Sequence, residues 1–300
     1  MRICLVFGNH PSREVYIQSS IETLMLGRQK VLLSVICSLK NAGKPITKRY
    51  IDKVLFLLKK EYSIDDIVKF YNFYPHHFGP FSNNYYIDLS YLESRGFIDD
   101  KLAPREDIAT DSTFDGNITD IISRFPDYNG IIEYVYGKYP EYAVKSVLKQ
   151  NNAESHPPKI FSIGYEKKDI DSFLDLLIRN GIEMVVDVRA NPFSMNFAFT
   201  RSKLERSLEK TGISYMHIPN LGIDGSFRKK LSARADYDEL FAYYSSSILP
   251  KNMEYVKKVI SLGASKRIAL LCFESDHDYC HRGTLSSKIT EISGQAVEHL

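Results

Sequence analysis

The sequence predicts an α/β protein in which a mainly helical N-terminal domain precedes a C-terminal domain with a parallel sheet. Up to about residue 149, apolar residues recur at helical spacing. From residue 159 onward, short apolar runs alternate with amphipathic stretches, a pattern typical of strands joined by helices. A polar segment at 150–158, which ends in two prolines, separates the two patterns. We therefore expect one domain at 1–150 and a second at 159–300.

The N-terminal half carries several amphipathic stretches. The helices that we expect there cover 19–40, 47–62, 85–94 and 129–149. Thr47 is a suitable N-cap for the second of them. Residues 99–127 are rich in Asp and Glu, and we expect them to form an acidic wing or loop.

Two motifs flank the predicted helix at 85–94. The first is Phe-Gly-Pro-Phe-Ser at 78–82, and the second is Leu-Glu-Ser-Arg-Gly-Phe-Ile at 92–98. In this order and spacing, residues 25–100 resemble the winged-helix-like segments of the Panacea and YwgA-like families. The resemblance implies a module that binds nucleic acid or another protein. A purely structural helical cap is the alternative.

Basic residues gather in two parts of the chain, although the formal net charge is only +2. Between Arg28 and Lys60 there are nine basic residues and a single acid, Asp52. A second basic run lies at 225–230, where nearby aromatic residues could stack on bases. The residues that we expect to contact nucleic acid are Lys44, Lys48, Arg49, Arg228, Lys229 and Lys230. A solvated surface is the alternative in both regions.

Reactive side chains follow each predicted strand of the C-terminal half. We expect strands at 160–163, 184–188, 215–218 and 268–272. The residues at or just past their ends are Gly164, Tyr165, Asp187, Arg189, His217, Cys272 and Glu274. Because the carboxyl ends of parallel strands share one edge of a sheet, we expect these residues to line a single crevice.

Five short blocks of this half occur in an order that resembles a known family. They are Ser-Ile-Gly-Tyr at 162–165, Val-Asp-Val-Arg at 186–189, Tyr-x-His-Ile-Pro-x-Leu-Gly at 215–222, Leu-Cys-x-Glu at 271–274 and Cys-His-Arg at 280–282. Residues 159–295 are similar to the domain-of-unknown-function family 488. The resemblance implies a fold and a site, but no settled reaction. The Pro-containing stretch that the family has after Asp-x-Arg is here 190–194, and His277 is an addition.

The candidate catalytic residues are Asp187, Glu274, Arg189 and His217. Asp187 would polarise a water or hold a sugar hydroxyl, and Arg189 would bind a phosphate or carboxylate. A structural ion pair between these two is the alternative. Glu274 is our candidate general base, because apolar neighbours would raise the pKa of a buried carboxyl group. His217 is equally compatible with a purely structural role.

The substrate-binding candidates are Gly164, Tyr165, Asn191, Cys272, Cys280, His281 and Arg282. Arg282 lies in the first turn of the last predicted helix, which suits an anion. Cys272 and Cys280 could be a nucleophile pair, but Arg282 is ten residues after Cys272 and the loop between them is acidic. A zinc site with His277 and His281 is a further alternative, although its spacing fits no established zinc pattern. We expect no metal and no cofactor.

This inventory predicts an enzyme that acts on DNA or on a nucleotide-like substrate. N-glycosidic hydrolysis, as in a DNA glycosylase, suits it, because that reaction needs a carboxylate, a pocket for the base and phosphate-binding cations. The alternatives are a DNA-binding regulator that senses a small anion and a Mg²⁺-dependent nuclease using Asp187, Glu274 and Asp276. No apolar run is long enough to span a bilayer and no secretory signal is recognisable, so we expect a cytoplasmic setting without membrane contact.

Overall fold

The computed structural model describes residues 25–106, 108, 112–125, 127–145, 156–228 and 233–300. The chain divides into two compact units. One contains residues 1–71 and 84–135, and the other contains residues 72–83 and 136–300. Each unit is built from two separate stretches of the chain, whereas the sequence pattern suggests one boundary between 150 and 159.

Helices form the N-terminal unit. They are α2 (Gly27–Asn41), α3 (Lys48–Glu61), α4 (Asn83–Ser94), α5 (Asp115–Arg124) and α6 (Tyr128–Lys138), with short 3₁₀ turns at Ile64–Asp66 and Ser112–Phe114. Helix α3 begins where the sequence predicts, because the Thr47 hydroxyl accepts a hydrogen bond from the Tyr50 backbone N–H at 3.2 Å. None of the described helices is both long enough and apolar enough to cross a bilayer.

The acidic segment is not a wing or loop throughout. Ten of its residues form helix α5, whose Ile118, Ile121 and Ile122 are buried. These three residues follow helical spacing, and burying them stabilises the helix despite its polar composition. The prediction of an irregular acidic segment over 99–127 is therefore wrong for Asp115–Arg124.

A five-stranded parallel sheet organises the C-terminal unit and confirms the predicted α/β class. Its strands are β3 (Lys159–Gly164), β4 (Met184–Asp187), β5 (Ser214–His217), β6 (Arg267–Cys272) and β7 (Val297–His299), in the order β5-β4-β6-β3-β7. Neighbouring strands pair in parallel throughout. The last strand, β7, has no counterpart in the sequence prediction.

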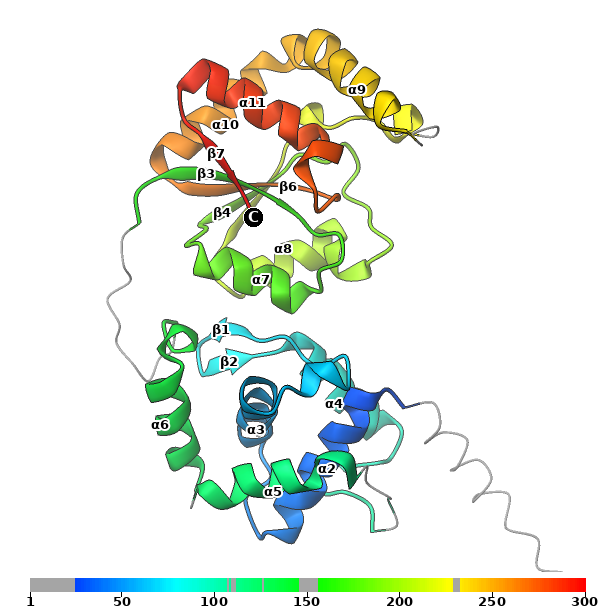
Figure 1. The fold of residues 1–300 in the computed structure, drawn as a ribbon, viewed down its shortest axis with the longest axis vertical. Coiled ribbons are helices and arrows are strands. Elements are labelled where there is room, and N and C mark those ends of the chain that lie inside the picture. Colours follow the sequence, from blue (N-terminus) through cyan, green and yellow to red (C-terminus); the bar gives the residue numbers. More distant parts are fainter. Residues whose placement is uncertain (1–24, 107, 109–111, 126, 146–155, 229–232) are drawn as a thin grey trace, which may run out of the picture. The chain divides into compact units, whose positions relative to one another are not determined.

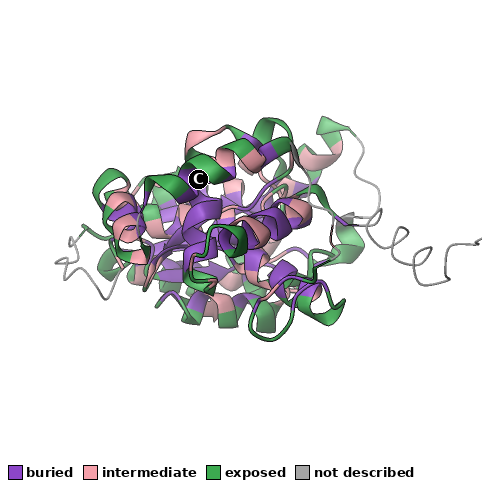
Figure 2. Cartoon of the chain, turned by 90° about the horizontal axis from the view of Figure 1, so that it is seen from below, coloured by how far each residue is buried: buried purple, intermediate pink, exposed green. Residues whose placement is uncertain are grey.

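Helices cover both faces of this sheet (Figure 1). On one face, α7 (Ile170–Arg179) and α8 (Arg201–Glu209) share a buried cluster with Phe161, Val185 and Leu271. On the other, α9 (Arg234–Tyr243), α10 (Met253–Ser265) and α11 (His281–Ser293) share a second cluster with Ile160, Val186 and Leu270. Alternate strand residues therefore point to opposite layers, as a sheet buried on both faces requires. Figure 2 shows buried residues on the inward sides of the helices and exposed residues on their outer sides.

The sequence pattern over 237–262 predicts one long helix, and the structure shows that this prediction is wrong. Helix α9 passes into a π-helical turn at Tyr244–Ile248, a 3₁₀ turn follows at Pro250–Asn252, and α10 begins only at Met253. Pro250 cannot donate the backbone hydrogen bond that an uninterrupted helix would need at this position.

A short antiparallel hairpin also belongs to the C-terminal unit. It consists of β1 (Tyr74–His76) and β2 (Gly79–Phe81), and its two-residue turn ends at Gly79 with φ of 87°. The buried Asp171 of α7 accepts hydrogen bonds from the Ser82 hydroxyl at 2.8 Å and from the Asn83 backbone at 2.9 Å. The Phe-Gly-Pro-Phe-Ser motif at 78–82 therefore belongs to a hairpin that is anchored to α7.

Candidate functional site

The predicted strand ends meet at one edge of the sheet. In the register of the sheet, Gly164 pairs with Cys272, and Asp187 pairs with both Leu271 and His217. The four strand ends therefore bring their reactive side chains together, which is the arrangement that the sequence predicts.

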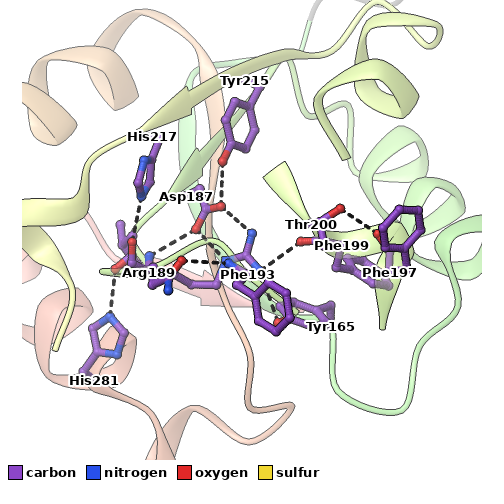
Figure 3. A network of polar contacts seen from close by, with 12 residues as sticks. Tyr165, Asp187, Arg189, Phe193, Phe197, Phe199, Thr200, Tyr215, His217 and His281 are labelled. Carbon is purple, nitrogen blue, oxygen red and sulfur yellow. Dashed lines mark hydrogen bonds and ion pairs between the residues drawn. The ribbon is translucent and has the colours of Figure 1, made fainter. Parts of the chain in front are cut away.

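Asp187 is at the centre of a buried polar network (Figure 3). Its carboxylate accepts hydrogen bonds from Arg189 Nε at 2.9 Å and from Arg189 Nη2 at 2.6 Å, in the two-pronged geometry that suits a guanidinium. The Tyr215 hydroxyl donates to the same carboxylate at 2.7 Å. Arg189 Nη1 donates to Tyr165 Oη at 3.1 Å and to the Phe199 carbonyl at 3.0 Å.

The contacts of this network raise the pKa values of Arg189 and Tyr215. Burial, the largest single influence, would lower the pKa of the Arg189 guanidinium, but the hydrogen bonds and charge of Asp187 together with the contact to Tyr165 outweigh burial and raise the pKa. Burial and the negative charge of Asp187 also raise the pKa of Tyr215 well above its usual range. Asp187 itself has no exposed surface. The geometry is that of the structural ion pair, the alternative left open by the sequence, and a direct catalytic role of Asp187 stays a prediction.

His217 contacts this network through the backbone. Its Nε2 lies 2.8 Å from the Arg189 carbonyl oxygen, and its ring is half-buried (Figure 3). Tyr215 and His217 are two positions apart in β5 and so lie on the same face, from which they contact Asp187 and the Arg189 backbone after β4. His217 therefore holds the backbone of Arg189 in this structure.

A cavity of about 360 Å³ opens beside the network. The aromatic residues Tyr165, Phe193 and Phe273 line it, together with Asn191 and Asn196. Arg189 and Cys272 also line its wall. Tyr165 is held by stacking on Phe199, with 4.4 Å between the ring centroids, whereas Phe193 is 66% exposed. One aromatic residue of the lining, Tyr165, is therefore firmly packed, and another, Phe193, is accessible to a ligand.

Cys272, Cys280 and His281 lie together at the base of this edge, and each is at most 1% exposed. His281 Nδ1 lies 3.6 Å from Cys272 Sγ and 4.0 Å from Cys280 Sγ. Its Nε2 lies 3.2 Å from the Val188 carbonyl oxygen (Figure 3). Burial, followed by the neighbouring Cys272 thiol, raises the pKa of Cys280 well above its usual range. Within the described residues, neither thiol forms a disulfide.

Arg282 binds the protein's own backbone rather than facing an open anion site. Its guanidinium donates to the carbonyl oxygens of Glu274 and Ser275, the latter at 2.8 Å, and to the Ser162 hydroxyl at 3.3 Å. Arg282 is only 1% exposed. It therefore fixes the loop after β6 against the second half of β3, in place of the anion-binding role expected from the sequence.

Gly164 also has a packing role. A Cβ atom at this position would lie 1.7 Å from the Glu274 carbonyl oxygen, so only glycine allows the two backbones to approach this closely. The Glu274 side chain is half-buried and accepts a hydrogen bond from Cys272 Sγ at 3.4 Å. Cys272 lines the cavity, so the Glu274 carboxylate contacts a residue of the cavity wall.

The basic candidates have different surroundings. Lys48 and Arg49 are exposed in the first turn of α3, whereas the Lys44 ammonium donates to the Phe125 carbonyl oxygen at 3.1 Å. Lys229, Lys230 and the side chain of Arg228 lie outside the described residues. The basic run of the N-terminal half is not a single surface, because Lys53 is 1% exposed and pairs with Asp52.

Sequence reasoning missed several residues of the site. Tyr215, Phe199, Ser194 and Asn196 each contact the network or line the cavity. Tyr215 had a usable signal, because it precedes His217 by two residues in the same strand and so lies on the same face. The others lie in the loop at 190–200, whose path a periodicity argument does not give.

Comparison with protein families gives one match. The family model described as domain of unknown function DUF488 matches residues 169–289, within the C-terminal unit, and confirms the resemblance of that half. The match includes Asp187, Arg189, His217 and the segment from Cys272 to Arg282. No curated protein and no solved structure matches the chain.

Proposed function

We propose that the protein is a nucleic-acid-associated hydrolase whose C-terminal unit binds a nucleobase in the cavity beside Arg189 and cleaves its N-glycosidic bond. The observation that carries this proposal is the cavity itself, which combines accessible aromatic rings with amide side chains. Its volume of about 360 Å³ lies in the range of sites for small organic ligands.

The cavity wall suits a planar heterocycle. Phe193 and Phe273 are 66% and 44% exposed, so both present ring surface on which a base can stack. Asn191 and Asn196 also line the cavity, and their amides can supply donors and acceptors to the edge of that base beyond their contacts with the Phe193 N–H and the Lys168 carbonyl oxygen. Stacking together with hydrogen bonding at the edge is how proteins hold an unpaired base.

Glu274 is the carboxylate that we assign to the reaction. Both oxygens of Asp187 accept hydrogen bonds from Arg189, and one also accepts from Tyr215, whereas Glu274 keeps exposed surface. In the proposed reaction, Glu274 takes a proton from water as the water oxygen bonds to the anomeric carbon of the sugar. The bond from that carbon to the base nitrogen breaks, the base nitrogen takes up a proton from solvent, and Glu274 releases to solvent the proton that it accepted.

The alternative nuclease chemistry has less support. Asp187 would have to bind Mg²⁺, but its oxygens already hold Arg189 and Tyr215. The guanidinium charge beside it would also repel a divalent cation.

DNA is the partner that we propose for the N-terminal unit. Lys48 and Arg49 are exposed at the start of α3, where the helix dipole adds to their attraction for a phosphate group. We place the protein in a reducing, cytoplasmic setting, where the buried thiols of the site stay reduced.

The test is incubation of the full-length protein with labelled single- and double-stranded oligonucleotides that carry normal or damaged bases. Released base is measured by chromatography, and strand cleavage is measured with and without alkali. We expect base release and cleavage only after alkali, and a loss of at least about 100-fold in Glu274→Gln. Glu291→Gln is the control, because Glu291 is an exposed residue of α11. Absence of base release from every substrate, or strand cleavage without alkali, would overturn the proposal.

A matched pair of phenylalanines tests the binding pocket in the same assay. Phe193 is 66% exposed and lines the cavity, whereas Phe197 is 67% exposed and belongs to the same loop without lining it. Phe193→Ala should weaken binding about 5- to 100-fold, the usual range for one base–aromatic stack, and Phe197→Ala should leave it unchanged. Equal effects of the two substitutions would place the base outside this cavity.

A further inference from the structure

Cys272, Cys280 and His281 form a buried group whose residue types, and whose distances between ligand atoms in space, suit a metal site. One ligand atom from each residue lies within 4.8 Å of the other two. The three residues come from the end of β6, the position before α11 and the first position of α11, so a rigid strand and a rigid helix fix them. Thiolate and imidazole are the ligands that zinc prefers in proteins.

The orientation of His281 supports this interpretation. Its Nε2 is 3.2 Å from the Val188 carbonyl oxygen, which is an acceptor, so Nε2 carries the proton. The lone pair of the neutral ring is then on Nδ1, the atom that faces both sulfurs. A backbone carbonyl that fixes the outer nitrogen of a histidine is the usual second contact of a metal ligand.

The distances fit tetrahedral coordination with little adjustment. Zinc bonds of about 2.3 Å to sulfur and about 2.05 Å to nitrogen place sulfur and nitrogen ligands about 3.6 Å apart. The observed separations from Nδ1 are 3.6 Å to Cys272 Sγ and 4.0 Å to Cys280 Sγ. Small side-chain rotations are therefore sufficient to admit the ion.

We propose that Cys272, Cys280 and His281 bind one zinc ion, with a fourth position directed toward the cavity. Two thiolates and one Zn²⁺ have no net charge, so the complex can be buried where a lone thiolate would be costly. Cys272 lines the cavity, and its sulfur lies 3.4 Å from Glu274 Oε2. A site with three protein ligands leaves room for water as the fourth, as in catalytic zinc sites.

The role of this zinc rests on the proposed function, but its binding does not. If the cavity holds a base, the zinc-bound water is the water from which Glu274 takes a proton, because zinc lowers the pKa of bound water toward neutrality. Zinc would then replace the metal-free reaction that we expected from the sequence. The proposed site also lacks His277, which the sequence offered as a zinc ligand, because His277 is 38% exposed and lies outside the buried group.

Metal analysis of the full-length protein tests the binding directly. The protein is purified with reductant, without an affinity tag that binds metals, loaded with zinc and passed through a desalting column. We expect about one zinc per chain, and a cobalt-substituted protein with the sulfur-to-cobalt charge-transfer absorption of two thiolates. Cys280→Ser and His281→Ala should each lower zinc affinity by at least about 10-fold. Addition of azide should shift the visible cobalt bands if the fourth position is open.

Two control variants separate this site from other metal-binding side chains. Cys37→Ser removes a half-buried thiol of the N-terminal unit, and His277→Ala removes the imidazole of the exposed group formed with Asp276 and Asp278. Both should keep wild-type zinc content. Zinc content well below one per chain after loading, or equal content in Cys280→Ser and wild type, would overturn the proposal. Tight zinc binding without base release would leave the zinc site standing and remove the glycosidase.

Discussion

Each unit of the molecule buries an ion pair between residues close in sequence, and the two pairs differ in how they hold their charges. In the C-terminal unit, Arg189 and Asp187 meet through two hydrogen bonds, the shorter of 2.6 Å. In the N-terminal unit, Lys53 Nζ lies 3.4 Å from Asp52 Oδ2 on helix α3. The lysine and arginine side chains are both nearly inaccessible, at 1% and 6% exposed.

The pKa shifts of the two cations have opposite signs. Burial lowers the pKa of Lys53, and the attraction of Asp52 does not fully compensate. For Arg189, the hydrogen bonds and charge of Asp187 together with the contact to Tyr165 outweigh burial and raise the pKa. A planar guanidinium that binds both carboxylate oxygens therefore keeps a raised pKa, whereas the ammonium in its looser contact has a lowered pKa. The arginine pair suits a site that must present a fixed shape and charge to a ligand.

The largest effect on the free energy of unfolding should come from breaking the Arg189–Asp187 ion pair. Arg189→Met leaves the fully buried Asp187 carboxylate with the Tyr215 hydroxyl but without its counter-charge. We expect a loss of about 3–5 kcal/mol in the free energy of unfolding, the usual cost of removing one partner of a buried pair. Urea unfolding followed by circular dichroism measures it.

The control is an arginine in an exposed pair. Arg234 bonds Asp238 one helical turn away at 3.0 Å, and both side chains are more than half exposed. Arg234→Met should leave the free energy of unfolding nearly unchanged, because water screens such pairs. Similar losses in the two variants would mean that burial does not distinguish the pairs.

A smaller effect should follow from removing the tyrosine that completes the same network. Tyr215→Phe deletes the hydroxyl that donates to Asp187 at 2.7 Å and keeps the ring. We expect a loss of about 1–3 kcal/mol, since a buried charged acceptor loses one donor but keeps Arg189. Tyr243→Phe, at a residue that is 42% exposed, is the matched control and should be neutral. An unchanged unfolding midpoint for Tyr215→Phe would show that Arg189 alone satisfies Asp187.

The sequence predicts the sheet edge well because apolar runs end abruptly there. The run that ends at Cys272 and the run that ends at Asp187 are both strands of the structure, and the parallel order makes their ends neighbours. The family match to residues 169–289 covers most of the same region. Strand ends can be located from sequence because burial on both faces demands continuous apolar residues.

Contacts between side chains could not be predicted in the same way. His281 reaches Cys272 across nine positions because the loop between them folds back, and Arg282 holds that loop through its carbonyl oxygens. The break at Pro250 and the helix at Asp115–Arg124 show two further limits. In the first, helical periodicity continued past a residue that interrupts the helix. In the second, polar composition obscured three buried isoleucines.

The smallest effect should be a pH dependence of the free energy of unfolding that comes from the Lys53–Asp52 pair. Because the pKa of Lys53 is lowered in the folded protein, the unfolded chain binds more protons as the pH approaches the ordinary lysine value of 10.5. Stability contributed by this residue therefore rises with pH in that window, by at most about 1.4 kcal/mol per pH unit. Lys53→Met should remove this rise, so the difference in unfolding free energy between this variant and wild type should change between pH 7.5 and 9.5.

Arg189→Met should lower stability equally across that range, because the raised pKa of Arg189 keeps it charged throughout. A stability difference for Lys53→Met that is constant with pH would show that the ammonium stays charged, and the two buried pairs would then differ in geometry alone.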